Sequence, residues 1–110
     1  MKKRVDFLFV EKNDDIYTIS MTPELQDDVG TVGFVEFAID DTLEANDSMV
    51  NIEASKTVLE LNTPLAGDIV ERNEAAISDP SLLGSADSTE NWIIKLKNVN
   101  ETEFEQLEDA

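Results

Sequence analysis

The sequence predicts a mainly β domain of two antiparallel sheets, a sandwich or flattened barrel, with short helices beside it. Short segments rich in β-branched and aromatic residues recur along the chain, and turn-forming residues separate them. A chain of 110 residues has room for one domain with a modest core. Its hydrophobic fraction of 41% is ordinary for a folded protein. We therefore treat residues 1–110 as a single folded domain.

The strands are expected where apolar residues alternate or cluster between turn signals. The segments are Val5 to Val10, Ile16 to Met21, Thr31 to Phe37, Met49 to Glu53, Thr57 to Leu61, Leu65 to Arg72, and Trp92 to Lys97. In the third segment, the alternation places Val32 and Phe34 on a common face. In the last, it points Trp92, Ile94 and Leu96 inward. A glycine within a strand, Gly67, marks a bulge or a close approach of two backbones.

Short helices are expected wherever a capping residue precedes a proline or an acidic turn. Thr22 is followed by Pro23, and Gly30 ends that helix. A helical turn is expected near Asn73 to Ile77, and Asp79 caps a second Pro-initiated helix. A C-terminal helix begins after Asn100, with Glu103 at the capping-box position.

The charge of the chain limits the kinds of partner it can bind. The formal net charge is −17, from 25 acidic and 8 basic residues. Phosphate backbones and anionic membrane surfaces attract lysine and arginine, so neither nucleic acid nor a membrane is an expected partner. Basic protein surfaces fit this charge better. No segment resembles an export signal or a membrane helix, so a cytoplasmic protein is expected.

The chain contains neither cysteine nor histidine. This excludes disulfides, thiol nucleophiles and the catalytic triads that need an imidazole. Asp40 and Asp41 do not have the regular ligand spacing of a calcium or magnesium loop, so no metal site is expected. The commonest catalytic groups are therefore missing, which fits a protein that is not an enzyme.

One lysine stands apart from this acidic surface. Lys56 is the only basic residue between Lys12 and Arg72. It lies at the corner between two predicted strands, in the segment Ala54-Ser55-Lys56, where a hairpin tip is expected. A lysine amine is protonated at neutral pH, so alone it is a poor nucleophile. An enzyme that removes the proton and supplies an activated acyl group could modify it, although a lysine in a turn is commonly only solvated.

Three segments resemble, in order and spacing, the H protein of the glycine cleavage system. They are Ile52 to Thr57, Pro64 to Glu74, and Trp92 to Lys97. The family reads Glu-Ser-Val-Lys-Ala, Ala-Pro-Val-Ser-Gly-Glu-Val-Val-Glu-Val-Asn, and Gly-Trp-Leu-Ile-Lys-Ile-Lys at these places. The resemblance extends from about Thr22 to Ala110. It implies a lipoyl-type barrel-sandwich hybrid.

The resemblance also implies roles for particular residues. Lys56 takes the place of the lysine that receives lipoate through an amide bond. Glu53 takes the place of the glutamate that lipoate-attaching enzymes use in recognition. Gly67 takes the place of the glycine that shapes the backbone beneath the hairpin. The chain departs from the family at Ser55, where valine is usual, and at Asn46 and Asn91, where glycine is usual. It also lacks the family's His-Glu-Trp, near which Phe7-Leu8-Phe9 stands.

The implied function is that of a lipoyl carrier, with lipoate as its covalent cofactor. Its partners would be a lipoate ligase or lipoyl transferase, and the P, T and L proteins of glycine cleavage or other lipoyl-dependent enzymes. A short H-like subgroup of bacteria suggests an alternative, a lipoate relay or oxidative-stress circuit with a sirtuin-type ADP-ribosyltransferase and a macrodomain hydrolase. Asp27 and Asp28 would then be candidate ADP-ribose acceptors. An acidic interaction domain that is never modified is a further alternative.

Overall fold

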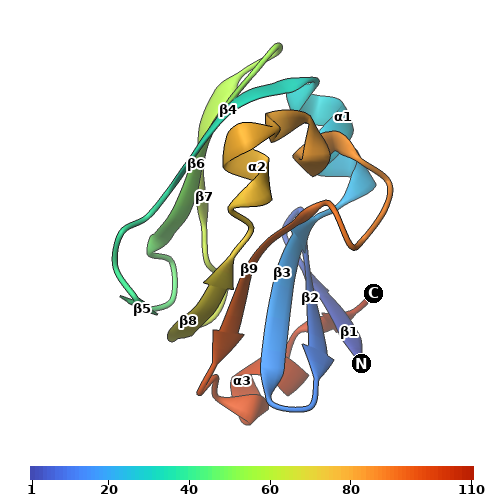
Figure 1. Ribbon diagram of the computed structural model, residues 1–110. Helices are drawn as coiled ribbons and strands as arrows, with labels where there is room; N and C mark the ends of the chain where they lie inside the picture. Colours follow the sequence, from blue (N-terminus) through green and yellow to red (C-terminus); the bar gives the residue numbers. More distant parts are fainter.

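The computed structural model describes all 110 residues, and antiparallel strands are its main regular structure (Figure 1). Its strands are β1 (Lys2–Val5), β2 (Leu8–Asn13), β3 (Ile16–Met21), β4 (Val32–Phe37), β5 (Thr42–Leu43), β6 (Ser48–Ala54), β7 (Val58–Asn62), β8 (Gly67–Arg72), β9 (Trp92–Lys97) and β10 (Glu108–Asp109). Its helices are α1 (Pro23–Val29), α2 (Ala75–Ser78), the 3-10 helix η1 (Pro80–Gly84) and α3 (Glu101–Glu105).

The strands form two sheets, as the sequence predicts. The larger has seven strands in the order β10-β1-β2-β3-β9-β8-β5, and the smaller has three in the order β4-β6-β7. In Figure 1 the small sheet stands on the left, the helix α1 lies near its upper end, and α3 lies below the large sheet. The two antiparallel sheets and short flanking helices of the prediction are confirmed. None of the helices has the length and apolar character that crossing a membrane would require.

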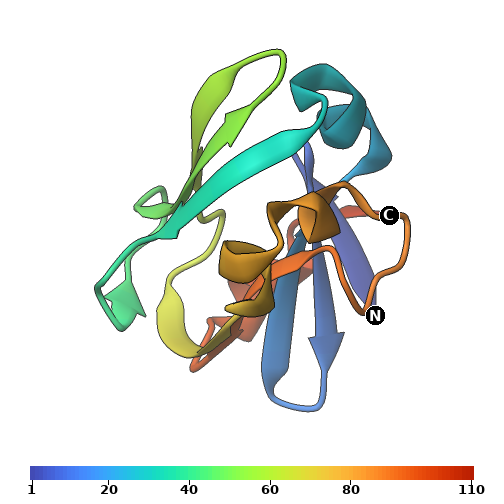
Figure 2. The ribbon, with the colours of Figure 1, turned by 45° about the horizontal axis from the view of Figure 1, so that its top comes forward.

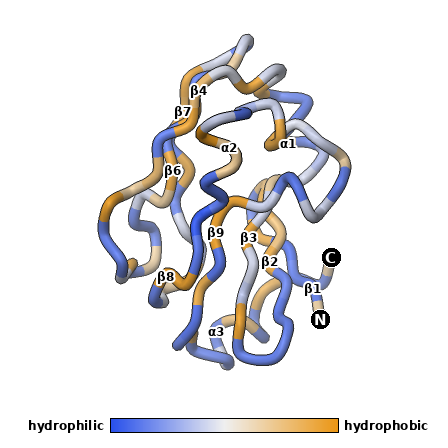
Figure 3. Tube along the Cα trace, in the orientation of Figure 1, coloured by the Kyte–Doolittle hydropathy of each residue, from blue (hydrophilic) through white to orange (hydrophobic).

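The core lies between the sheets and under the helices. It contains 21 buried hydrophobic residues. Val10, Ile19 and Leu96 come from the large sheet, whereas Val50 and Ile52 come from the small one, and all five are fully buried. In Figure 3 the hydrophobic colour follows the strands, while the turns are largely hydrophilic. Burial of these alternating side chains is the main force that holds the two sheets together.

The first helix begins and ends as its sequence predicts. The Thr22 hydroxyl accepts a hydrogen bond from the Leu25 amide at 3.2 Å and donates one to the Phe7 carbonyl at 2.9 Å. Pro23 occupies the first turn. Gly30 ends the helix with a φ of 78°, a backbone conformation that residues other than glycine rarely adopt.

The predicted first strand, Val5 to Val10, is wrong because a turn interrupts it. Asp6 has a φ of 53°, and the chain reverses there between β1 and β2. The basic N-terminus, which gave no strand signal, is therefore the edge strand β1. The short strand β10 pairs with it, and Lys3 forms a 2.6 Å ion pair with Asp109.

In β4 the predicted common face of Val32 and Phe34 is also wrong. The register with β6 shifts between these two residues, so Gly33 is an extra residue on β4. A bulge reverses the alternation of faces along a strand. Val32 and Val35 are consequently buried, whereas Phe34 is exposed.

In β9 the prediction that Trp92 points inward is wrong because of a second bulge. The register with β3 shifts at Ile93, so Trp92 leaves the face that Ile94 and Leu96 share. Ile93 and Ile94 are fully buried, but Trp92 is only half-buried. The Lys95 ammonium lies 4.7 Å from the centre of the Trp92 ring, which is a cation–π contact.

The two N-cap predictions for helices in the second half of the chain have different outcomes. Asn100 caps α3, because its side-chain oxygen accepts from the Glu103 amide at 3.1 Å. Phe104 then packs edge-on against Tyr17, with ring centres 5.1 Å apart. Asp79, however, makes no side-chain cap for η1, because its carboxylate accepts from the Ser81 hydroxyl instead.

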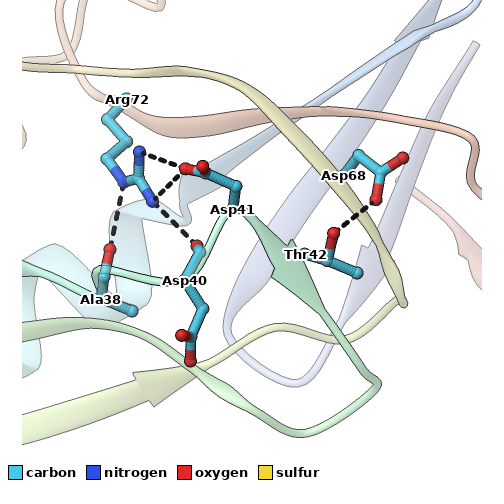
Figure 4. Close-up of polar contacts among 6 residues, drawn as sticks. All are labelled: Ala38, Asp40, Asp41, Thr42, Asp68 and Arg72. Carbon is cyan, nitrogen blue, oxygen red and sulfur yellow. Dashed lines mark hydrogen bonds and ion pairs between the residues drawn. The ribbon is translucent and has the colours of Figure 1, made fainter.

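Arg72 fastens the loop between β4 and β5 to the large sheet (Figure 4). Its guanidinium donates to the Ala38 carbonyl at 3.1 Å and to the Asp40 carbonyl at 2.8 Å, and it pairs with the Asp41 carboxylate at 3.4 Å. Asp41 thus faces a guanidinium. The Thr42 hydroxyl donates to the Asp68 carboxylate at 2.9 Å, which adds a side-chain bond between β5 and β8.

Candidate functional site

The predicted hairpin tip is present between β6 and β7. The strands pair up to Glu53 and Val58, and the Ala54 amide closes the tip by donating to the Thr57 carbonyl at 2.9 Å. Ser55 and Lys56 follow Ala54 and are exposed. Figures 1 and 2 show the tip projecting at the upper end of the small sheet, close to α1. The hairpin therefore presents Lys56 at one end of the molecule.

The backbone of the tip is bonded to the segment that ends α1. The Ser55 amide donates to the Thr31 carbonyl at 2.8 Å, and the Lys56 amide donates to the Val29 carbonyl at 3.0 Å. In return, the Thr31 amide donates to the Ser55 hydroxyl at 2.9 Å. Carbonyls at a helix C-terminus have no partner within the helix, so the tip satisfies groups that water would otherwise have to bind.

The Lys56 side chain lies along the same corner. Its ammonium donates to the Asp27 carbonyl at 2.9 Å. The last turn of α1 contains no basic residue of its own, so Lys56 supplies a positive charge at the negative end of that helix. The exposed side chain remains within reach of an enzyme once this one hydrogen bond is given up.

Gly30 makes this arrangement possible. A Cβ atom built on Gly30 would lie 2.3 Å from the Ser55 hydroxyl and 3.1 Å from the Lys56 Cγ. Both distances are shorter than ordinary contacts, so any side chain here would push the tip away. The sequence predicted Gly30 only as a helix end; its role under the tip depends on two segments about 25 residues apart in the chain.

Lys56 has no ion pair, although the chain has 25 acidic residues. Five of the basic residues do form ion pairs; they are Lys3, Arg4, Lys12, Arg72 and Lys95. The carboxylates of Asp27 and Asp28, in the helix whose end Lys56 contacts, are exposed and make no salt bridge with it. With one hydrogen bond and no ion pair to give up, the Lys56 side chain can move into the site of a partner enzyme at small cost.

Glu53 lies on the outer face of the hairpin, beside Val58 and Phe34 in the neighbouring strands. Its side chain is exposed. The structure therefore brings Glu53 and Lys56 to the same end of the hairpin. The role of Glu53 in recognition stays a prediction.

Gly67 lies elsewhere, where β5, β8 and β9 meet. It pairs with Leu43, and a Cβ atom on it would come within 2.9 Å of both the Lys97 carbonyl and the Val99 side chain. The predicted close approach of two backbones is confirmed. Its neighbours do not belong to the tip, and Figure 1 shows β8 at the lower end of the small sheet, away from the tip that joins β6 to β7. A role for Gly67 in enzyme recognition stays a prediction.

The structure brings α1 to the site, which the sequence did not predict. Asp27, named only as a candidate ADP-ribose acceptor, contributes its backbone carbonyl to Lys56, while its side chain and that of Asp28 are exposed. The largest cavity is not part of the site. It has a volume of about 780 Å³ and lies beside β8 and α2, where Arg72 and Trp92 are among its lining residues.

Comparisons with known proteins identify the family of the chain. Residues 2–110 match the family model described as glycine cleavage H-protein. A glycine cleavage system H-like protein from Staphylococcus aureus is 51% identical over 110 residues, which cover all of both chains. A glycine cleavage system H protein from Bacteroides thetaiotaomicron is 35% identical over 103 residues, covering 93% of this chain and 82% of its own.

A solved structure has the same fold. The crystal structure of a glycine cleavage system H protein from Mycobacterium marinum superposes with a TM-score of 0.75. It shares 24% sequence identity, and the match covers 87% of this chain and 81% of the other. Since the family model spans almost the whole sequence and the relatives align over nearly all of it, the chain belongs to the glycine cleavage H-protein family.

Proposed function

We propose that this protein is a lipoyl carrier and that lipoate is attached to the Nζ atom of Lys56. A partner enzyme would supply lipoate with its carboxyl carbon bonded to an activating group. The unprotonated amine would attack that carbon and form an amide bond, the bond to the activating group would break, and that group would leave with the electron pair while the enzyme takes up the proton of the amine. The lysine stem and the lipoyl chain together would form a mobile arm, whose dithiolane carries the chemistry.

The observation that carries this proposal is the way in which Lys56 is presented. The backbone of the tip is fixed by α1, while the side chain is exposed and bonded to only one neutral carbonyl. A modifying enzyme would meet a preorganised loop and would lose little entropy in ordering it. Membership of the H-protein family supports the same assignment.

The proposed partners follow from the family. They are a lipoate ligase or lipoyl transferase, and the P, T and L proteins of glycine cleavage. The chain would act as a substrate of these enzymes and not as a catalyst. The 51% identical relative is named H-like, which favours a second candidate, a lipoate relay outside glycine cleavage. The names of the two relatives described above do not refer to ADP-ribose, and the sirtuin and macrodomain partners stay predictions.

Intact mass spectrometry tests the attachment. The protein is incubated with a lipoate ligase, ATP and lipoate, beside Lys56→Arg and a control, Lys97→Arg. Lys97 is also exposed and also unpaired. One lipoyl increment on the wild type and on Lys97→Arg, with none on Lys56→Arg, is the expected result. Full modification of Lys56→Arg, or none of the wild type, would contradict the proposal.

A second assay separates the two candidate functions. The lipoylated protein is added to reconstituted P protein, and the exchange of labelled bicarbonate with the glycine carboxyl group is measured. Exchange at a rate comparable to that with an established H protein would identify a glycine-cleavage carrier. If a fully lipoylated sample supports no exchange, the lipoate relay is the candidate function that remains.

A further inference from the structure

The outer face of the small sheet has an order that the pairing of its strands defines. Phe34, Glu53 and Val58 pair across β4, β6 and β7 in one row. Directly opposed residues of an antiparallel sheet point to the same side. Because all three are exposed, this row faces solvent. Glu53 therefore lies between two apolar neighbours.

A second outward row lies farther from the tip and is polar. It consists of Glu36, Asn51 and Glu60, which pair in the same way and are all exposed. The row between the two points inward and contributes Val35, Ile52 and Leu59 to the core or its margin. The two outward rows together are called the outer face below.

The first row exposes two large apolar side chains to solvent. Phe34 is 48% exposed and Val58 is 71% exposed. Phe34 points outward because the bulge at Gly33 shifts its register, as described above. Bulges next to functional sites commonly redirect a side chain. Two exposed apolar groups on either side of a carboxylate, next to the proposed modification site, are typical of a surface that a partner covers.

The charge of the outer face specifies the partner. Its three carboxylates come from Glu36, Glu53 and Glu60, and it contains no basic residue. A second copy of a chain with a net charge of −17 would be repelled. A basic surface would be attracted, and its association would be steered by charge.

We propose that the outer face is the docking surface for the enzyme that acylates Lys56, and that this enzyme presents an apolar contact bordered by lysine or arginine side chains. Phe34 and Val58 are the apolar anchors, and the three glutamates bind the basic border. The surface is continuous with the tip, so an enzyme docked on it would reach Lys56. This inference depends on the proposed function.

Steady-state kinetics of lipoate attachment test it, with the carrier as the varied substrate. Phe34→Ala with Val58→Ala should raise the KM for the carrier by about 10-fold or more and leave kcat within about twofold, because truncated anchors weaken docking without moving the lysine. Val70→Ala is the matched control. Val70 is 47% exposed on β8 of the other sheet, and its replacement should leave KM unchanged.

Charge is tested separately with Glu36→Gln combined with Glu60→Gln. This variant should raise KM at low salt, and the difference from wild type should shrink as salt rises, because added ions screen the attraction. Circular dichroism confirms that each variant is folded. The anchors lie on the solvent side, so their loss should leave the fold intact.

The possible failures are distinguishable. If the wild type is lipoylated but the double alanine variant has an unchanged KM, the docking surface is wrong and the carrier function stands. If the wild type is never lipoylated, both the docking surface and the carrier function are wrong. If sedimentation shows a wild-type dimer that the double alanine variant abolishes, the outer face binds a second copy and the proposed partner is wrong.

Discussion

Two hairpins of this protein have a lysine at or near the turn, and the two lysines have different surroundings. Lys12 lies near the end of β2, next to the turn at Asp14 and Asp15. Its ammonium pairs with Glu101 of α3 at 2.7 Å and lies 5.8 Å from the centre of the Tyr17 ring. The hydrogen bond to the Glu101 carboxylate raises the pKa of Lys12 above its ordinary value.

Lys56, in contrast, contacts a neutral carbonyl and no carboxylate. The turns differ as well. The turn after β2 is exposed, with Asp14 in the left-handed conformation at a φ of 55°. The tip after β6 is bonded to the carbonyls of Val29 and Thr31. The comparison shows that one lysine joins elements of the fold by an ion pair, whereas the other belongs to a tip that the fold itself presents.

Gly30→Ala should have the largest effect, because it disturbs the contact with α1 that distinguishes the Lys56 tip from the turn near Lys12. The side chain would meet the Ser55 hydroxyl and would be strained at a φ of 78°. Such strain costs about 1–3 kcal/mol, and a displaced tip should slow lipoate attachment on the order of 10-fold. Urea unfolding and the ligase assay measure the two effects. Gly84→Ala is the control, because a Cβ atom there has no neighbour within 4 Å. Equal behaviour of the two variants would show that α1 does not hold the tip.

Ser55→Ala should have an intermediate effect. It removes the hydrogen bond from the Thr31 amide, which measures 2.9 Å, and leaves the other tip bonds in place. A single bond of this kind contributes roughly 0.5–1.5 kcal/mol, and the exposed position favours the lower end. Amide hydrogen exchange should become faster at Thr31 while exchange in β3 is unchanged. Ser88→Ala is the control, since no hydrogen bond of the Ser88 hydroxyl is present. Unchanged exchange at Thr31 would contradict a pinned tip.

Lys12→Met should have the smallest effect, because it removes one ion pair and leaves the Lys56 tip untouched. The thermal midpoint should fall slightly, while lipoate attachment at Lys56 should be unchanged. The folded pKa of Lys12 is raised, so its contribution to stability is complete below the ordinary lysine pKa of about 10.4 and is lost as pH rises through the folded pKa. The wild-type advantage over Lys12→Met should therefore persist at neutral pH and disappear in strongly alkaline solution. An advantage that already disappears near neutral pH would contradict the ion pair as its source.

The sequence by itself was sufficient for the features that depend on near neighbours in the chain. Thr22, Pro23 and Gly30 define α1 because capping and left-handed geometry are local properties. Alternating apolar residues locate most strands, since burial of one face has a period of two residues. The hairpin tip at Lys56 was predicted from the same short-range signals, and the family resemblance added the expectation that Lys56 is modified.

Tertiary structure decided what depends on pairing between distant segments. The bulges at Gly33 and Ile93, which expose Phe34 and turn Trp92 from the core, follow from the register with neighbouring strands. Ile93 has no signature in its own segment, and Gly33 has only the general one of a glycine within a strand. The short edge strand β10 exists only because β1 lies beside it. Lys56 reaches the Asp27 carbonyl across 29 residues of chain. A periodic pattern reports which face of a strand is buried, but only the folded packing fixes which carbonyls meet a given amine.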